Sequence, residues 1–279
     1  MKNEKMATPK KENKAEIVKT TSASALSILS ESEGSGLGDL SPDQVLVPRI
    51  KLLQSQSPQA KKMHGDYVQG AEEGDILESV SQNLYKGAEG LLMVPFSYRY
   101  IFIEWEKNED GGGKLLENHG SKIPDCQSNG RGGYERTHPT LGIPTEIVPT
   151  FEYFIMIIDP ETGDTKDALI SMSKTNAKVA KRFNSMISDV RAENKEGKRV
   201  PAPMFWRTYQ LTSVPQSDDR NSWAIYKVEY GQNLIDMPGG EEILEQAFNK
   251  SVQVKNMEMG AEEEAQQSAT KSSKDDQPM

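Results

Sequence analysis

The sequence predicts a mostly β fold of the α+β class: an OB-like antiparallel barrel, elaborated by a long loop and two helices, with a disordered segment at each end. Strand-like segments follow one another through turn-rich linkers, and no strand–helix–strand alternation indicates a parallel sheet. The segments 1–40 and 258–279 hold too few apolar residues to bury a core. Residues 41–257 are therefore expected to fold as one β-rich domain.

Charge limits the functional classes. The net charge of the chain is −9. The segment 258–279 is acidic and forms a predicted acidic C-terminal tail, whereas the charges of segment 1–40 cancel. The domain between them is itself acidic, so bulk charge does not favour nucleic-acid binding, and any such function has to rest on local patches.

Cysteine usage and hydropathy indicate the compartment. Cys126 is the only cysteine, which excludes an intrachain disulfide and fits a reducing environment. No run of 18 apolar residues is present, and the N-terminus has no signal-type apolar segment. We expect a cytoplasmic protein with no membrane partner.

The first half of the domain is expected to be extended. Residues 41–60 predict an extended segment that docks on the core. Pro48 argues against a central strand position before Arg49. A short strand at 76–80 and a long ribbon at 91–105 follow. Residues 106–149 hold a run of glycines and four prolines, which predicts a long loop.

The second half is expected to consist of hairpins and helices. Proline and glycine in Asp159–Gly163 predict a tight turn, and Ser173 is a candidate helix cap. The predicted elements are hairpin strands at 151–158 and 168–172, a helix at 174–193, hairpin strands at 204–214 and 222–230, and a helix at 241–254.

The aromatic strand within 91–105 is the first candidate for function. Strict alternation along a strand puts one set of rings on a single face, namely Phe96, Tyr98, Tyr100 and Phe102. Arg99 falls on the other face. An aromatic face can pack a core or stack unpaired bases, and the polar tips of the two tyrosines favour exposure.

The second hairpin combines rings with cations. Alternation places Trp206 with Met204, Thr208 and Gln210, whereas Arg207 lies with Phe205, Tyr209 and Leu211. Trp223 starts the returning strand. A groove for a single strand needs rings for bases and cations for phosphates, and ordinary two-sided strands are the alternative interpretation.

The helix at 174–193 has one apolar face and one basic face. The apolar face repeats at helical spacing. The basic stripe contains no acid and consists of Lys174, Lys178, Lys181 and Arg182. Such a stripe can position a nucleic-acid backbone, and it can equally be a solvated helix face.

The loop at 106–149 offers basic residues and three possible metal ligands. Lys114, Lys122, Arg131 and Arg136 accompany glycines that would let the loop wrap a strand. His119, Cys126 and His138 match no metal-binding spacing, so we expect no metal and no cofactor. Signatures of nucleotide-binding, hydrolase and metalloprotease sites are absent, so we expect no enzyme and no catalytic residue.

Several stretches resemble one family. They are Val47-Pro-Arg-Ile-Lys-Leu-Leu-Gln-Ser-Gln-Ser-Pro58, Gly74-Asp-Ile76, Val94-Pro-Phe-Ser-Tyr-Arg-Tyr-Ile-Phe-Ile-Glu-Trp105, Ile170-Ser-Met-Ser173, Phe205-Trp-Arg207 and Thr212. Across residues 43–232 the chain resembles single-stranded-DNA-binding replication proteins of tailed bacteriophages. The resemblance implies an OB-like domain and an acidic tail. The tail departs from the general pattern, since it ends Asp275-Asp-Gln-Pro-Met279 without a terminal aromatic residue.

We therefore predict a non-catalytic, sequence-tolerant single-stranded-DNA-binding protein of phage replication or recombination. Its partners would be single-stranded DNA and replication proteins recruited by the acidic tail, and an oligomer is possible. A scaffold or virion-associated interaction module is the alternative, and a nuclease is a third. The predicted nucleic-acid-binding residues are Tyr98, Tyr100, Phe102, Lys174, Lys178, Lys181, Arg182, Trp206, Arg207 and Trp223.

Overall fold

A computed structural model describes the backbone of residues 46–107, 113–219 and 221–272, and side chains as far as residue 256. Eleven strands form one sheet. Along its main path they are β13 (Ser222–Asn233), β12 (Arg207–Ser217), β4 (Leu91–Glu106), β8 (Pro144–Ile158), β9 (Thr165–Ser173), β1 (Arg49–Leu52), β2 (Ile76–Glu78) and β3 (Leu84–Tyr85). The predicted disordered segment 1–40 lies outside the described residues.

The remaining elements attach to this sheet. Off the main path are β5 (Leu115–Asn118), β6 (Gln127–Ser128) and β7 (Tyr134–Thr137), and a separate ribbon is made by β10 (Arg191–Glu193) and β11 (Arg199–Pro201). The helices are α2 (Ala177–Asp189) and α3 (Gly240–Ser272). Short 3₁₀ turns are η2 (Pro58–Ala60), η3 (Lys174–Asn176), η4 (Met204–Trp206) and η5 (Leu234–Asp236).

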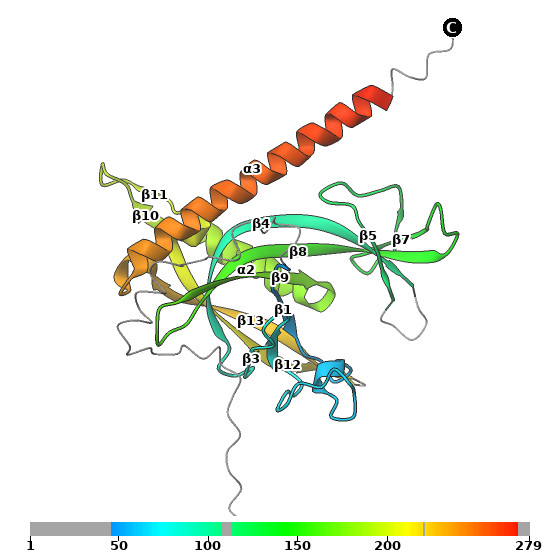
Figure 1. Ribbon diagram of the computed structural model, residues 1–279, viewed down its shortest axis with the longest axis horizontal. Coiled ribbons are helices and arrows are strands. Elements are labelled where there is room, and N and C mark those ends of the chain that lie inside the picture. The colour runs from blue at the N-terminus through cyan, green and yellow to red at the C-terminus, as the bar shows by residue number, and fades with distance from the viewer. Residues whose placement is uncertain (1–45, 108–112, 220, 273–279) are drawn as a thin grey trace, which may run out of the picture.

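The mostly β class and the two helices are confirmed, but the sheet is not wholly antiparallel. β1 pairs with β9 in parallel, with Arg49 opposite Leu169, and with β2 in antiparallel. The sheet curls into a half-barrel, with β13 at one end of the main path and β3 at the other (Figure 1). The finer OB-like assignment is not confirmed by this strand order.

Side chains, rather than a further strand, hold β13 against β1. The Gln54 amide exchanges two hydrogen bonds with the backbone of Ala224: the Ala224 N–H donates to Oε1 at 3.0 Å, and Nε2 donates to the Ala224 carbonyl at 2.9 Å. Asn176 Oδ1 accepts the N–H of Tyr226 at 2.8 Å. These side-chain hydrogen bonds to the backbone of β13 take the place of pairing with a further strand, and they hold the half-barrel in its curled form.

Replacing Gln54 should therefore loosen the curl. Gln54→Ala leaves the buried Ala224 N–H and C=O without partners, and we expect it to lower the free energy of unfolding by about 2 kcal/mol. Urea unfolding measures the change. Gln56→Ala is the matched control, because Gln56 is exposed and its side chain accepts a hydrogen bond only from the Lys61 ammonium among the described contacts. Equal unfolding midpoints for the two variants would contradict the role given to Gln54.

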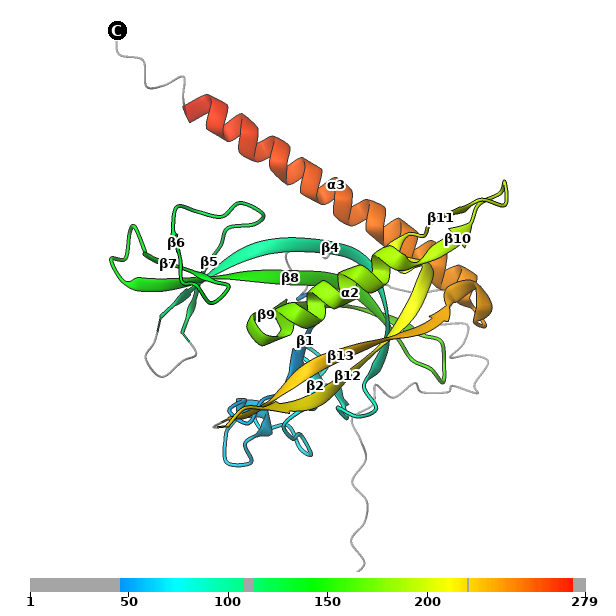
Figure 2. The ribbon, with the colours of Figure 1, turned by 180° about the vertical axis from the view of Figure 1, so that it is seen from behind.

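Two helices cover opposite faces of the sheet. Helix α2 packs on the inner face, between the β4–β8 ribbon and the β12–β13 hairpin (Figure 2). Helix α3 packs on the outer face of β4 and runs on past the sheet (Figures 1 and 2). The inner core includes Met93, Tyr153, Ile155, Ile170, Phe183, Tyr209 and Tyr226, and the outer core includes Val94, Phe96, Met156, Ile158, Ile243 and Ala247.

A β-bulge divides the aromatic strand. The register between β4 and β8 shifts between Pro95 and Ser97, so strict alternation fails there. Phe96 packs in the outer core, whereas Tyr98 lies opposite Tyr153 on the inner face. The prediction that Phe96 shares a face with Tyr98 is therefore wrong. Arg99 lies on the face opposite Tyr98 and Tyr100, as predicted, but it shares the outer face with Phe96, and it pairs there with Glu152.

The predicted long loop at 106–149 is mostly a small β lobe. β4 and β8 stay paired as far as Glu106 and Thr145, which makes one long ribbon. β5 pairs with β4, β7 pairs with β8, and β6 pairs with β7 at the far end of that ribbon. Gly120, Gly130 and Gly132 lie outside the strands, in the connections of this lobe, and have a left-handed backbone, whereas Pro144 and Pro149 lie within β8. The three added strands, β5, β6 and β7, are only two to four residues long.

Three further predictions need correction. Met204–Trp206 is a 3₁₀ turn, so the strand begins only at Arg207. The side chain of Ser173 makes no capping hydrogen bond. Helix α3 was predicted to end at residue 254 and a disordered tail to begin at residue 258, but the helix continues as far as Ser272. Residues 273–279 lie outside the described part of the chain.

In the described part of the chain, no helix combines the length and the apolar character needed to cross a membrane.

Candidate nucleic-acid interface

Two tyrosine rings stand half-exposed on the inner face of the β4–β8 ribbon. Tyr98 and Tyr100 are 36% and 39% exposed. Each packs against a buried ring of β8: the Tyr98 centroid lies 5.2 Å from that of Tyr153, and the Tyr100 centroid lies 4.9 Å from that of Phe151. Rings held in place at one edge and open to solvent are suited to stacking flat ligands.

Phe102 does not belong to this exposed pair. Its ring is buried and packs between Tyr100, at 5.3 Å, and Tyr134, at 6.2 Å. Phe102 therefore supports Tyr100 and offers no open ring to a base, which corrects its predicted role.

Helix α2 is fixed to the inner face by its buried side. The Tyr153 hydroxyl bonds the Ala180 carbonyl at 3.0 Å and Asn184 Oδ1 at 2.7 Å, and the Phe183 ring lies 4.9 Å from both Tyr153 and Tyr209. The 3.6-residue spacing of apolar residues that predicted the helix also predicted which side of it is buried. Because the buried side is fixed, the residues on the opposite side are held at the surface.

The exposed side of α2 carries three free cations. Lys178, Lys181 and Arg182 are exposed, and within the described residues no carboxylate forms an ion pair with them. Lys181 shares a flank with Asn184, three residues on, and Asn184 bonds the Tyr153 hydroxyl, so this flank lies on the ribbon side of α2. Arg182 shares the other flank with Met186, four residues on. The helix therefore presents positive charge across its width, beside the Tyr98 and Tyr100 rings.

Lys174 lies apart from this surface. It belongs to η3, has a left-handed backbone (φ 48°) and pairs with Glu146 at 2.7 Å. Alternation along β8 puts Glu146 on the face opposite Phe151, which is the outer face. The predicted four-cation stripe is therefore three free cations and one paired lysine.

The remaining predicted residues scatter over the second hairpin. Trp206 lies in η4, which contacts β4 and α3 on the outer side of the sheet. Trp223 lies opposite Gln216 at the far end of the hairpin, on the face opposite buried Ala224. The Arg207 guanidinium stacks on the Tyr230 ring at 4.6 Å. The tryptophans are thus not brought together with Tyr98 and Tyr100.

Some residues that shape this surface were not among those predicted from the sequence. Phe151, Tyr153 and Asn184 position the exposed tyrosines and the helix, and Tyr230 contacts α2 through its hydroxyl, which donates to the Met186 carbonyl at 3.1 Å. Alternation marks Phe151 and Tyr153 as one face of a strand, so that signal was present. The partnership of Tyr230 with α2 joins residues 44 positions apart, and no local pattern encodes it.

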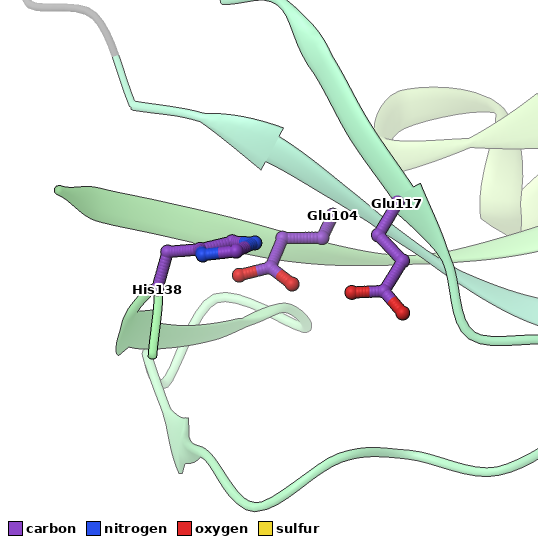
Figure 3. A group of neighbouring side chains, drawn as sticks. All are labelled: Glu104, Glu117 and His138. Carbon is purple, nitrogen blue, oxygen red and sulfur yellow. The ribbon is translucent and has the colours of Figure 1, made fainter. Parts of the chain in front are cut away.

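A second group of polar side chains fills the β lobe at the end of the ribbon. Carboxylates of Glu104 and Glu117 and a nitrogen of His138 lie within 4.8 Å of one another (Figure 3). Glu104 is fully buried. Its carboxylate accepts hydrogen bonds from Arg136 Nε at 2.9 Å, Thr145 Oγ1 at 2.5 Å and His119 Nε2 at 2.8 Å.

This group does not fit a metal centre. His138 Nδ1 accepts the backbone N–H groups of Thr140 and Leu141, which places the ring proton on Nε2 and removes that nitrogen as a ligand. The Arg136 guanidinium already neutralises Glu104. Burial by itself raises the pKa of Glu104, but the hydrogen bonds from Arg136, Thr145 and His119 outweigh it and lower the pKa to about 2. The group is a buried ion pair that fastens the lobe to β4.

Comparison with known proteins gives one match. A family model described as Pam3 phage gp34-like protein matches residues 5–272, nearly the whole chain. No curated protein matches, and no solved structure matches. The bacteriophage part of the resemblance seen across residues 43–232 is confirmed, and the DNA-binding part stays a prediction.

Proposed function

This chain belongs to the family of Pam3 phage gp34-like proteins, and we propose that it is a non-catalytic single-stranded-DNA-binding protein of phage replication or recombination. The observation that supports the proposal best is the surface formed by the half-exposed Tyr98 and Tyr100 rings and the three free cations of α2. Bases would stack on the rings, and phosphates would lie along Lys178, Lys181 and Arg182. The OB-like character of the half-barrel is part of the same proposal.

Local charge makes this surface selective for a polyanion. The chain carries a net charge of −9, so its charge as a whole does not attract DNA. An unpaired cationic helix beside open rings is therefore the place where attraction and stacking coincide. Both contributions are independent of base identity, so the proposed binding is sequence-tolerant and weakens with salt.

Fluorescence anisotropy with labelled oligo-dT tests the proposal. We expect binding by the full chain at low salt, steep weakening as salt rises, and weaker binding to duplex DNA, whose bases are not free to stack. An absence of binding at low salt, or an affinity that does not respond to salt, would reject the proposed function.

The tyrosines are expected to contribute through their rings. Tyr98→Ala and Tyr100→Ala should each weaken oligo-dT binding by about 5- to 150-fold, because one stacked base contributes about 1–3 kcal/mol. Tyr→Phe at either position should retain binding, since the ring remains. Tyr67→Ala, in a partly buried tyrosine of the segment before β2, is the control and should bind as the unmodified chain does. Ala variants that bind normally would remove the stacking role.

A protein-interaction role is the second candidate, and α3 favours it. Phe248 and Val252 lie one turn apart on α3 and are each more than one-third exposed. An apolar strip on a helix that runs past the sheet is a feature of docking surfaces (Figure 1). Under this interpretation, Phe248→Ser would abolish partner capture while oligo-dT binding would be absent from the unmodified chain.

A further inference from the structure

Helix α2 separates two ring-bearing surfaces, only one of which was predicted. The Tyr98 and Tyr100 rings lie on the ribbon side of α2. Strand β13 lies on the other side of α2 (Figure 2). Its Tyr230 is 47% exposed. The Tyr230 hydroxyl is bonded to the Met186 carbonyl of α2, so the ring is held in a fixed place against the helix. A strand that stacks on the first surface would meet the second after crossing α2.

The surroundings of Tyr230 resemble those of a stacking residue more than those of a core residue. One side of its ring is occupied by the Arg207 guanidinium at 4.6 Å, and the Tyr209 ring lies 6.0 Å away. Arg182 lies one helical turn before Met186, on the same flank of α2. An exposed ring thus has one cation stacked against it and a second on the adjacent helix flank.

Unpartnered donors gather beneath this ring. Arg207 Nε and the Tyr209 hydroxyl are two of the three buried side-chain polar atoms that have no hydrogen-bond partner among the described residues. Tyr209 is fully buried, and burial raises the pKa of its hydroxyl, which therefore remains a donor. A buried donor without an acceptor is unfavourable, so the hydrogen bonding beneath the ring is incomplete in the unbound chain.

We propose that Tyr230, backed by Arg207 and flanked by Arg182, forms a second nucleotide-contact position, so that bound single-stranded DNA crosses α2 from Tyr98 and Tyr100 to Tyr230. This inference rests on the proposed function. A base stacks on the open side of Tyr230, and phosphates lie over Lys178, Lys181 and Arg182 between the two positions. Arg207 is a positioning residue for the ring, because its guanidinium stacks on Tyr230 and donates to the Gly231 carbonyl of the same β-strand.

The crossing sets a minimum length for the ligand. An α-helix with its side chains is about 10–12 Å across. A stacked strand advances only about 3.4 Å along its axis per nucleotide. A trinucleotide therefore reaches one flank of α2, whereas a strand of about ten nucleotides, within the usual range of about 4–16 for a single binding unit, reaches both.

Oligo-dT of about three and about ten nucleotides, titrated against the full chain, tests the inference. Tyr230→Ala should weaken binding of the long oligonucleotide by about 5- to 150-fold and leave binding of the short one unchanged. Tyr230→Phe, which keeps the ring and loses the hydrogen bond to Met186, should bind the long oligonucleotide nearly as the unmodified chain does. Lys227→Ala, an exposed residue on the other face of β13, is the control.

The outcomes separate this inference from the proposed function. If the unmodified chain binds the long oligonucleotide and Tyr230→Ala binds it equally well, the crossing is wrong and the function stands. The crossing is also wrong if Tyr230→Ala weakens both lengths to the same extent, or if Tyr230→Phe binds as weakly as Tyr230→Ala, because the hydroxyl contact with α2 then matters rather than the ring. If the unmodified chain binds neither length, the proposed function fails.

Discussion

Neutralising the three free cations of α2 is expected to weaken oligo-dT binding by about 10- to 100-fold at low salt. The triple variant Lys178→Gln, Lys181→Gln and Arg182→Gln keeps good helix formers at each position, so α2 should persist. Each phosphate contact contributes about 0.7 to the slope of log affinity against log salt for a single strand. The slope should therefore become shallower by about 2, and the difference in affinity should shrink as salt rises.

The control for this variant removes the same charge elsewhere. Lys62, Lys195 and Arg199 are exposed and lie outside α2, in the segment before β2 and in the β10–β11 ribbon. Replacing all three by Gln changes net charge equally and should leave the slope nearly unchanged. Equal slopes for the two triple variants would show that α2 does not contact phosphates, even if the affinities differ.

The second large effect concerns stability and the buried ion pair of the β lobe. Glu104→Gln removes the charge that pairs with Arg136, whose side chain is only 15% exposed. Neutralising only one partner of a buried ion pair leaves the other charge unpaired. We therefore expect the free energy of unfolding to fall by about 3 kcal/mol. Urea unfolding at neutral pH measures the loss, and faster amide hydrogen exchange in β5 and β7 locates it. Glu117→Gln, an exposed carboxylate of the same lobe, should change stability by less than about 0.5 kcal/mol.

The same pair gives a dependence on pH with a defined sign. The pKa of Glu104 is lowered from 4.5 to about 2 in the folded chain, so folding favours the ionised carboxylate over the protonated acid. The stabilisation is present above pH 4.5 and is lost as pH falls towards 2. The unmodified chain should therefore lose more stability over this window than Glu104→Gln, which has no proton to take up. Parallel losses would contradict the assigned pKa.

The elements that the sequence predicted well are those with a long local pattern. Helix α2 followed from its apolar repeat, and the two hairpins followed from runs of strand-forming residues around turns. The bulge at Pro95 was missed because alternation was extended through it. Pro95 itself was the available signal, since proline inside a paired strand commonly marks an irregularity.

The features that escaped prediction depend on pairs distant in the chain. Glu104 meets Arg136 across 32 residues, and Gln54 meets Ala224 across 170. A carboxylate in an apolar strand and a glutamine in a linker look unremarkable until the partner is placed beside them. For the same reason, Trp206 and Trp223 were grouped with the tyrosines by composition, although the sheet puts them elsewhere.

Photocross-linking locates the strand directly. An oligo-dT containing 5-iodouracil attaches to aromatic side chains on which the modified base stacks, and tryptic peptides identify the site. Cleavage after Arg99 separates Tyr98 from Tyr100, so the two rings can be read independently. We predict adducts on both of these tyrosines that disappear in the triple variant of α2. Adducts confined to Trp206 or Trp223, or none on either tyrosine, would contradict a DNA-binding surface on the inner face of the half-barrel.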